Sequence, residues 1–138
     1  MKKREKVTKI MTADVSTVSV HESLRDVRDR LQSKKVRHLP VVSGDKLVGI
    51  LSRTDIMRLS FGGVFAGQEE ADEAIFDMLS IEQVMVSKPR TVQVEDTIHE
   101  VAEVFASEEF HALPVMDGDK LAGIVTTTDV IKYLLEMY

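Results

Sequence analysis

An internal repeat is the feature that most constrains the fold of this chain. Residues 7–59 align with residues 81–133 at a constant offset of 74, without a gap, and 17 of the 53 pairs are identical. The identities concentrate in two runs, Leu-Pro-Val at 39–41 and 113–115 and Gly-Asp-Lys-Leu at 44–47 and 118–121. Because tandem copies of a unit adopt similar structures, the fold must hold the same order of elements twice.

The residue pattern of each copy predicts secondary-structure elements in the order β-α-β-β-α. A short extended piece, at 17–20 or 91–94, precedes a helix whose apolar residues recur at helical spacing. Those residues are Leu24, Val27 and Leu31 in the first copy and Ile98, Val101 and Phe105 in the second. Two strands follow, at 39–42 and 47–51 or at 113–116 and 121–125. A Gly-Asp pair suits the hairpin between them, and Ser52 or Thr126 then caps a final helix.

The segment between the copies divides the chain into three parts. We predict a first repeat at 7–60, a linker at 61–79 and a second repeat at 80–136, within one module of 1–138. The linker starts with a glycine-rich loop at 61–67, expected to be the most mobile internal segment. An acidic helix at 68–79 follows, with an apolar stripe of Ala71, Ile75, Met78 and Leu79. Ser80 and Gln83 then predict a capping box for a short helix that runs to Val86.

The segments Gly-Ile-Leu-Ser-Arg-Thr-Asp at 49–55 and Gly-Ile-Val-Thr-Thr-Thr-Asp at 123–129 resemble the signature of CBS domains, named after cystathionine β-synthase. With the Leu-Pro-Val runs and the tandem copying, the resemblance covers nearly the whole chain. It implies an α+β fold in which two tandem β-α-β-β-α CBS repeats pack sheet to sheet with pseudo-two-fold symmetry, leaving two related clefts. It also implies a regulatory, non-catalytic module that needs no cofactor and binds AMP, ADP, ATP or S-adenosylmethionine. Such modules commonly form homodimers and regulate a partner protein.

Candidate ligand-binding residues gather at the start of each final helix. The carboxylates of Asp55 and Asp129 suit the two hydroxyls of a ribose. The hydroxyls of Ser52 and Thr54, or of Thr126 and Thr128, lie where free backbone N–H groups favour a phosphate. The alternative is that Ser52 and Thr126 only cap their helices and that the aspartates only oppose the helix dipole.

Further candidates follow from the resemblance. Arg37, His38 and His111 occupy strand-edge positions that carry phosphate contacts in nucleotide-binding members. The adenine slot is expected near Val15, Thr17 and Val41, or near Pro89, Thr91 and Val115. The alternative is that these cations are ordinary surface residues and that the apolar residues belong to the core.

Composition narrows the class of function. A net charge of -5 disfavours nucleic acid and anionic membranes as partners, because both are bound chiefly by clustered Lys and Arg. The absence of cysteine fits a cytoplasmic location, which we expect. Neither a nucleophile with its base nor a metal-binding motif is found, so we expect no enzyme and no metal.

The alternative function is a ligand-independent dimerisation or protein-interaction module. Surplus apolar residues on the final helices predict a homodimer.

Overall fold

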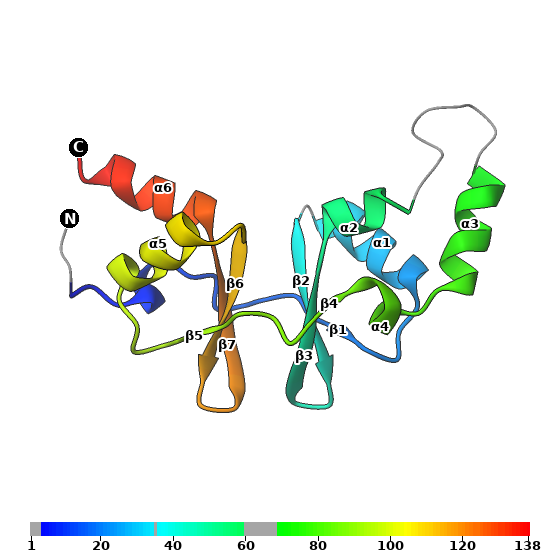
Figure 1. The fold of residues 1–138 in the computed structure, drawn as a ribbon, viewed down its shortest axis with the longest axis horizontal. Coiled ribbons are helices and arrows are strands. Elements are labelled where there is room, and N and C mark those ends of the chain that lie inside the picture. Colours follow the sequence, from blue (N-terminus) through cyan, green and yellow to red (C-terminus); the bar gives the residue numbers. More distant parts are fainter. Residues whose placement is uncertain (1–3, 35, 60–68) are drawn as a thin grey trace. The chain divides into compact units, whose positions relative to one another are not determined.

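The structure is a computed structural model that describes residues 4–34, 36–59 and 69–138 (Figure 1). It consists of two compact units. One unit comprises residues 16–88, and the other comprises residues 1–15 together with 89–138. Both combine a small sheet with helices, which confirms the predicted α+β class; the packing of sheet on sheet with pseudo-two-fold symmetry stays a prediction.

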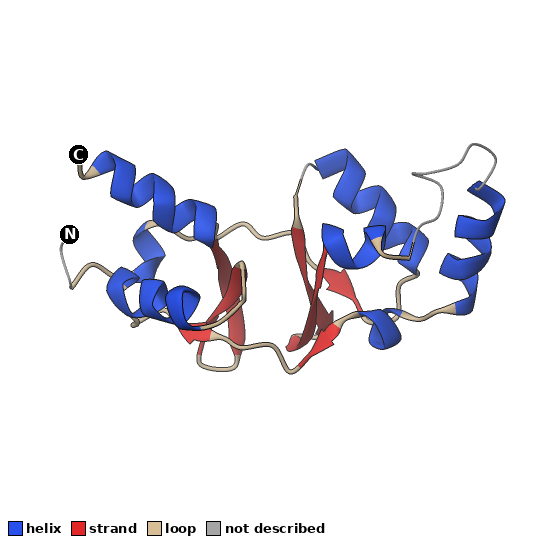
Figure 2. Cartoon of the chain, turned by 45° about the horizontal axis from the view of Figure 1, so that its top comes forward, coloured by secondary structure: helices blue, strands red, loops and turns tan. Residues whose placement is uncertain are grey.

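The unit of residues 16–88 contains a four-stranded sheet in the order β1-β2-β3-β4. Its elements are β1 (Val18–Ser19), α1 (Leu24–Lys34), β2 (His38–Ser43), β3 (Lys46–Ser52), α2 (Arg53–Met57), α3 (Glu69–Met78), α4 (Ile81–Val84) and β4 (Val86–Ser87). Strand β1 pairs in parallel with β2, and the remaining pairs are antiparallel. Helices α1 and α2 lie over one face of this sheet (Figure 2). The predicted apolar face of α1 lies in the core, where Leu24, Val27 and Leu31 are buried.

The unit of residues 1–15 and 89–138 contains a three-stranded sheet in the order β5-β6-β7. Its elements are the 3-10 helix η1 (Val7–Lys9), β5 (Val92–Gln93), α5 (Ile98–Ser107), β6 (Ala112–Asp117), β7 (Lys120–Thr126) and α6 (Thr127–Glu136). The equivalent α5 positions Ile98 and Val101 are fully buried, whereas Phe105 is only partly buried against the core.

The two hairpins turn at the predicted Gly-Asp pairs. Ser43 pairs with Lys46 in one hairpin and Asp117 with Lys120 in the other, so each turn has two residues. The glycines at 44 and 118 have φ of 61° and 62°, a region that residues with a Cβ atom adopt at a cost. Glycine is therefore the residue that lets both hairpins close tightly.

The leading segment of each repeat packs on the other repeat. Backbone N–H groups of Thr12 and Ile124 each donate to the carbonyl of the other residue, at 2.8 and 3.0 Å. At the equivalent position Val86 of β4 pairs with Ile50 of β3. The apolar residue that begins each segment, Val7 or Ile81, is completely buried in the core that its segment joins. The compact units thus differ from the sequence repeats by an exchange of these two segments.

The linker differs from its prediction in detail. The predicted acidic helix is present as α3; among its described side chains, at 74–78, the buried one is Phe76, while Met78 of the expected stripe is 79% exposed. Arg28 lies over the Phe76 ring, and Arg25 forms an ion pair with Asp77, so α3 packs against α1. The helix capped by Ser80 ends at Val84 rather than at Val86, because residues 86 and 87 pair with β3 instead. The glycine-rich loop at 61–67 lies outside the described residues.

Candidate functional site

A reciprocal capping box holds the aspartate at the start of each final helix. The Ser52 hydroxyl accepts from the Asp55 N–H at 3.1 Å, and Asp55 Oδ2 accepts from the Ser52 N–H at 2.9 Å. Thr126 and Asp129 repeat both bonds at the same two distances. The capping role proposed as the alternative is therefore real in both repeats.

The capping box leaves part of each carboxylate available. It uses only Oδ2; within the described residues, Oδ1 of Asp55 and of Asp129 accepts no hydrogen bond. Both aspartates are half-buried. A half-buried carboxylate oxygen held in one orientation is a suitable acceptor for a hydroxyl group of a ligand. Capping and ligand binding are thus compatible functions of one side chain.

The strand-edge candidates lie beside these helix starts. His38 pairs with Ser52 in the β2–β3 ladder. The Arg53 N–H donates to the Arg37 carbonyl at 2.8 Å, and the Thr127 N–H donates to the His111 carbonyl at 3.0 Å. The backbones of Arg37 and His111 are therefore hydrogen-bonded to the first residue of α2 and of α6, respectively. Arg37 and His111 are exposed, and His38 is half-buried.

The two copies of the site are unequal. Helix α6 has 10 residues, whereas α2 has five. A longer helix sums more peptide dipoles, so the α6 start favours an anion more strongly. The copy at Asp55 has two strand-edge cations, Arg37 and His38, while Ala112 replaces the second cation in the copy at Asp129.

The proposed adenine positions are only partly accessible. Val15, Thr17, Pro89 and Thr91 are half-buried. Val41 and Val115, near which the slot is expected, are completely buried in the two cores. Each lies two residues after a buried leucine of the same strand, Leu39 or Leu113, and therefore faces the same core.

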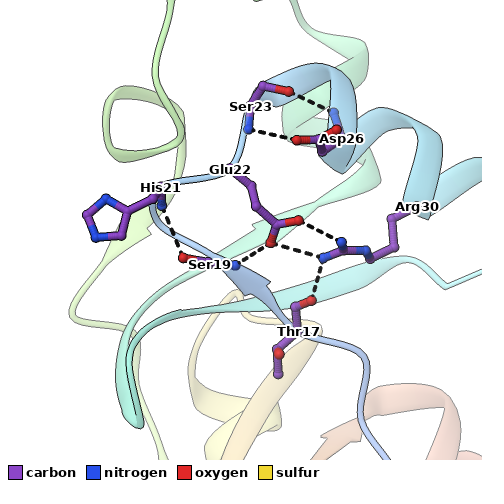
Figure 3. A network of polar contacts seen from close by, with 7 residues as sticks. All are labelled: Thr17, Ser19, His21, Glu22, Ser23, Asp26 and Arg30. Atoms are coloured by element: carbon purple, nitrogen blue, oxygen red, sulfur yellow. Dashed lines mark hydrogen bonds and ion pairs between the residues drawn. The ribbon is translucent and has the colours of Figure 1, made fainter.

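A polar network beside α1 was not anticipated from the sequence (Figure 3). The Arg30 guanidinium donates from Nη2 to Glu22 Oε1 at 2.7 Å and from Nη1 to the Thr17 carbonyl at 2.6 Å. Glu22 Oε2 also accepts from the Ser19 N–H at 2.6 Å. The hydrogen bond from Arg30 is the main cause that holds the pKa of Glu22 below its ordinary value. The one sequence signal for this network is the eight-residue spacing of Glu22 and Arg30, which is not specific.

Within residues 4–34, 36–59 and 69–138, no group of three or more His, Cys, Asp or Glu side chains is placed to hold a metal ion. None of the helices in those ranges has the length and apolar character needed to cross a membrane.

Comparison with known proteins decides the family. Residues 7–62 and 81–136 each match the CBS domain. The chain belongs to the CBS domain family. These two matches follow the sequence repeats rather than the compact units, because the family pattern includes the leading segment that packs on the other copy.

Three relatives bear on the function of this CBS pair. An uncharacterized protein of Methanocaldococcus jannaschii, MJ1225, is 30% identical over 131 residues. Its crystal structure matches 97% of this chain and 49% of the other, with a TM-score of 0.81. CBSX2 of Arabidopsis thaliana, crystallised in complex with AMP, is 27% identical with a TM-score of 0.78, covering 96% and 98% of the two chains. The inosine-5'-monophosphate dehydrogenase of Korarchaeum cryptofilum is 31% identical over 118 residues, which are 85% of this chain and 22% of the enzyme. The chain spans about half or less of the length of several curated relatives that it matches, MJ1225 among them.

Proposed function

We propose that this CBS pair is a regulatory module that binds an adenine nucleotide or a related adenosyl compound. The observation that carries the proposal is the fixed, half-buried carboxylate of Asp129 at the start of the ten-residue helix α6. Its Oδ1 faces no hydrogen-bond donor of the described residues, and the exposed His111 lies on the adjoining strand edge. The complex of CBSX2 with AMP supports this class of ligand.

In this proposal, each helix start serves the ribose and phosphate together. Asp55 or Asp129 accepts from the ribose hydroxyls. The helix N–H groups and the hydroxyl of Thr54 or Thr128 then donate to phosphate oxygens. Arg37, His38 and His111 add positive charge, the histidines more strongly when they are protonated. Thr17, Thr91, Val15 and Pro89 are the accessible residues that we assign to the adenine.

Calorimetric titration of the purified chain with AMP, ADP, ATP and S-adenosylmethionine tests the proposal. We expect saturable binding of at least one compound with a Kd below about 1 mM, which corresponds to roughly 4 kcal/mol of binding free energy. Guanosine nucleotides are the matched control for phosphate binding without adenine. Absence of saturation with all adenosyl compounds would reject the assignment.

We propose further that ligand occupancy is passed to a regulated partner protein. The match to a 22% portion of an inosine-5'-monophosphate dehydrogenase supports this role, because there the matched region is one part of a longer enzyme. The chain itself is expected to be a homodimer, not a catalyst, and to act in the cytoplasm.

A second candidate function is a ligand-independent assembly module. The observation that favours it is exposed apolar surface on the final helices, where Met57, Ile131 and Leu135 are 65%, 55% and 69% exposed. A thermal unfolding midpoint that no adenosyl compound raises, together with stable self-association, would favour this second function.

A further inference from the structure

A pocket of about 390 Å³ lies beside α5, within the unit that contains residues 89–138. It is lined by Arg90, Thr91, Val92, Asp96, Glu100, Glu103, Val104 and Ser107. Of these residues only Thr91 was among the candidate ligand-binding residues, so the pocket is otherwise separate from the proposed nucleotide site. Its walls hold three carboxylates and one guanidinium.

The first repeat has an arginine side chain at the position that corresponds to this pocket. With the offset of 74, Val104 corresponds to Arg30, Asp96 to Glu22 and Thr91 to Thr17. In the first repeat the Arg30 guanidinium binds the Glu22 carboxylate and the Thr17 carbonyl, at 2.7 and 2.6 Å (Figure 3). The chain therefore contains its own example of a guanidinium in this position.

The second repeat keeps the acceptor but lacks the cation. Asp96 Oδ2 accepts from the Gln93 N–H at 2.8 Å, just as Glu22 Oε2 accepts from the Ser19 N–H. This bond fixes the Asp96 carboxylate to the N–H three residues earlier, on a side chain one methylene shorter than that of Glu22, and within the described residues Asp96 Oδ1 has no hydrogen-bond partner. Val104 has neither the length nor the charge to replace Arg30. Val104 lines the pocket at the repeat position that Arg30 occupies in the first copy.

The other charged residues of the pocket wall are already engaged. Glu100 Oε1 accepts from the N–H and the hydroxyl of Thr97. Glu103 pairs with His99 at 2.9 Å, and Arg90 lies 3.5 Å from Glu108. Asp96 is therefore the wall carboxylate that is best placed to receive a further cation, and Glu100 and Glu103 add negative potential around it.

We propose that this pocket binds a guanidinium group, held by the Asp96 carboxylate and the Thr91 carbonyl as Arg30 is held in the first repeat. A guanidinium is planar and presents parallel N–H donors, which match a carboxylate in a bidentate pair better than an ammonium does. The occupant is a small guanidinium compound with an organic stem, because the pocket is larger than the guanidinium alone. The binding makes the second repeat electrostatically equivalent to the first.

Titration of the full chain with agmatine, followed by calorimetry and by amide NMR shifts, tests the proposal. We expect saturable binding with shifts centred on residues 90–107, and at least a tenfold loss of affinity in Asp96→Asn. 1,4-Diaminobutane, with an ammonium in place of the guanidinium, is the matched ligand and should bind more weakly. Equal affinity of Asp96→Asn, equal affinity of the diamine, or no saturable binding would overturn the proposal.

A substitution at position 104 tests the same geometry without a ligand. Val104→Arg should fill the pocket, raise the thermal unfolding midpoint and abolish agmatine binding. Its matched control is Val104→Lys, which brings a charge without the fork of donors and should stabilise less. A Val104→Arg chain that still binds agmatine with unchanged affinity would place the ligand elsewhere.

The first repeat offers the reverse experiment. Arg30→Ala should open an equivalent pocket beside α1 and lower the unfolding midpoint, and ethylguanidine should then restore stability in proportion to its concentration. A blocked Gly-Arg-Gly peptide, compared with agmatine on the unmodified chain, distinguishes an arginine of a partner protein from a small molecule. Tighter binding of the peptide would overturn the small-molecule source, and no rescue of Arg30→Ala would overturn the equivalence of the two sites.

Discussion

At the residue scale, Asp129 combines a structural and a proposed binding function on separate oxygen atoms. Oδ2 completes the capping box with the Thr126 N–H, while Oδ1 has no donor among the described residues. A substitution of Asp129 should therefore lower both the folding stability and the ligand affinity, but by different amounts of free energy. The structural loss concerns one hydrogen bond at a half-buried helix start, whereas the binding loss concerns charge-assisted hydrogen bonds to the ligand.

We expect Asp129→Ala to weaken nucleotide binding far more than folding. The free energy of unfolding should fall by at most about 1 kcal/mol through the lost hydrogen bond from the Thr126 N–H and the lost charge at the helix start. The loss of two charge-assisted hydrogen bonds is worth about 2 to 4 kcal/mol, a fall in affinity of roughly 30- to 1000-fold. Calorimetry and urea unfolding of the same preparation measure the two effects.

A capping residue elsewhere in the chain provides the control for Asp129→Ala. Glu100 has the same N3 position in the capping box of α5, with Thr97 as the cap. Glu100→Ala should cost similar stability and leave nucleotide affinity unchanged. If Asp129→Ala and Asp55→Ala, alone and combined, bind every adenosyl ligand as the parent chain does, both aspartates are capping residues only.

The ion pair of Glu22 and Arg30 should make stability depend on pH. The hydrogen bond from Arg30 lowers the folded-state pKa of Glu22, so the pair stabilises the chain above the ordinary glutamate pKa. This contribution is lost as the pH falls through the lowered pKa. The stability difference between the parent and Glu22→Gln should therefore shrink from about pH 6 to about pH 3. Urea unfolding across this range measures it, and a constant difference would contradict the prediction.

At the element scale, a glycine in β3 and one in β7 allow the exchanged leading segments to approach. A Cβ atom at Gly123 would lie 2.5 Å from the carbonyl oxygen of Thr12, which is part of the backbone. A Cβ atom at Gly49 would lie 2.3 Å from Met85 Sδ, which belongs to a flexible side chain, and 3.0 Å from the Val86 carbonyl oxygen. A Cβ atom at this repeat position should therefore be tolerated better at Gly49 than at Gly123.

We expect Gly123→Ala to destabilise the chain more than Gly49→Ala. The Thr12 carbonyl is held by the N–H of Ile124, so it cannot move without breaking that bond. Overpacking of this kind costs about 1 to 3 kcal/mol. Urea unfolding of the two variants compares the costs. An equal or larger cost for Gly49→Ala would mean that the Thr12 segment yields more easily than its hydrogen bonds imply.

Elements that depend on local sequence were predictable, and pairings between distant segments were not. The Gly-Asp hairpins and the Ser52 and Thr126 caps follow from residues a few positions apart, and the structure contains them. The exchange of leading segments depends on which sheet edge each segment meets. Similarity between the repeats cannot decide this, because Thr12 and Val86 occupy equivalent positions and each edge offers a Gly-Ile pair, at 49–50 in β3 and at 123–124 in β7.

The candidate site shows the same limit. The repeat located Asp55, Asp129 and their caps, because a capping box is a four-residue pattern. It did not reveal the pocket beside α5, where Val104 stands at the repeat position of Arg30. Nor did helical spacing show that Phe76 is buried and Met78 exposed. Which of two nearby helix positions is buried depends on the surface against which the helix packs.

At the scale of the whole molecule, the final helices of both repeats expose apolar side chains at one equivalent position. Met57 of α2 and Ile131 of α6 are 65% and 55% exposed. On α6, Leu135 lies one turn after Ile131 and is 69% exposed, while Val130 and Tyr133 face the core. An apolar stripe opposite the buried face of a helix is typical of a surface that packs against another copy.

We therefore expect a homodimer that depends on this stripe. Two acidic substitutions, Ile131→Glu with Leu135→Glu, should convert the dimer into a monomer, because burying two carboxylates against apolar surface costs several kcal/mol. Fold stability should change little, since exposed positions tolerate substitution within about 0.5 kcal/mol. Met78→Glu is the control, because Met78 is 79% exposed and belongs to α3 rather than to a final helix. Light scattering over a range of concentrations measures the mass. A parent chain that stays monomeric at high concentration, or a double variant that stays dimeric, would show that this stripe is not the interface.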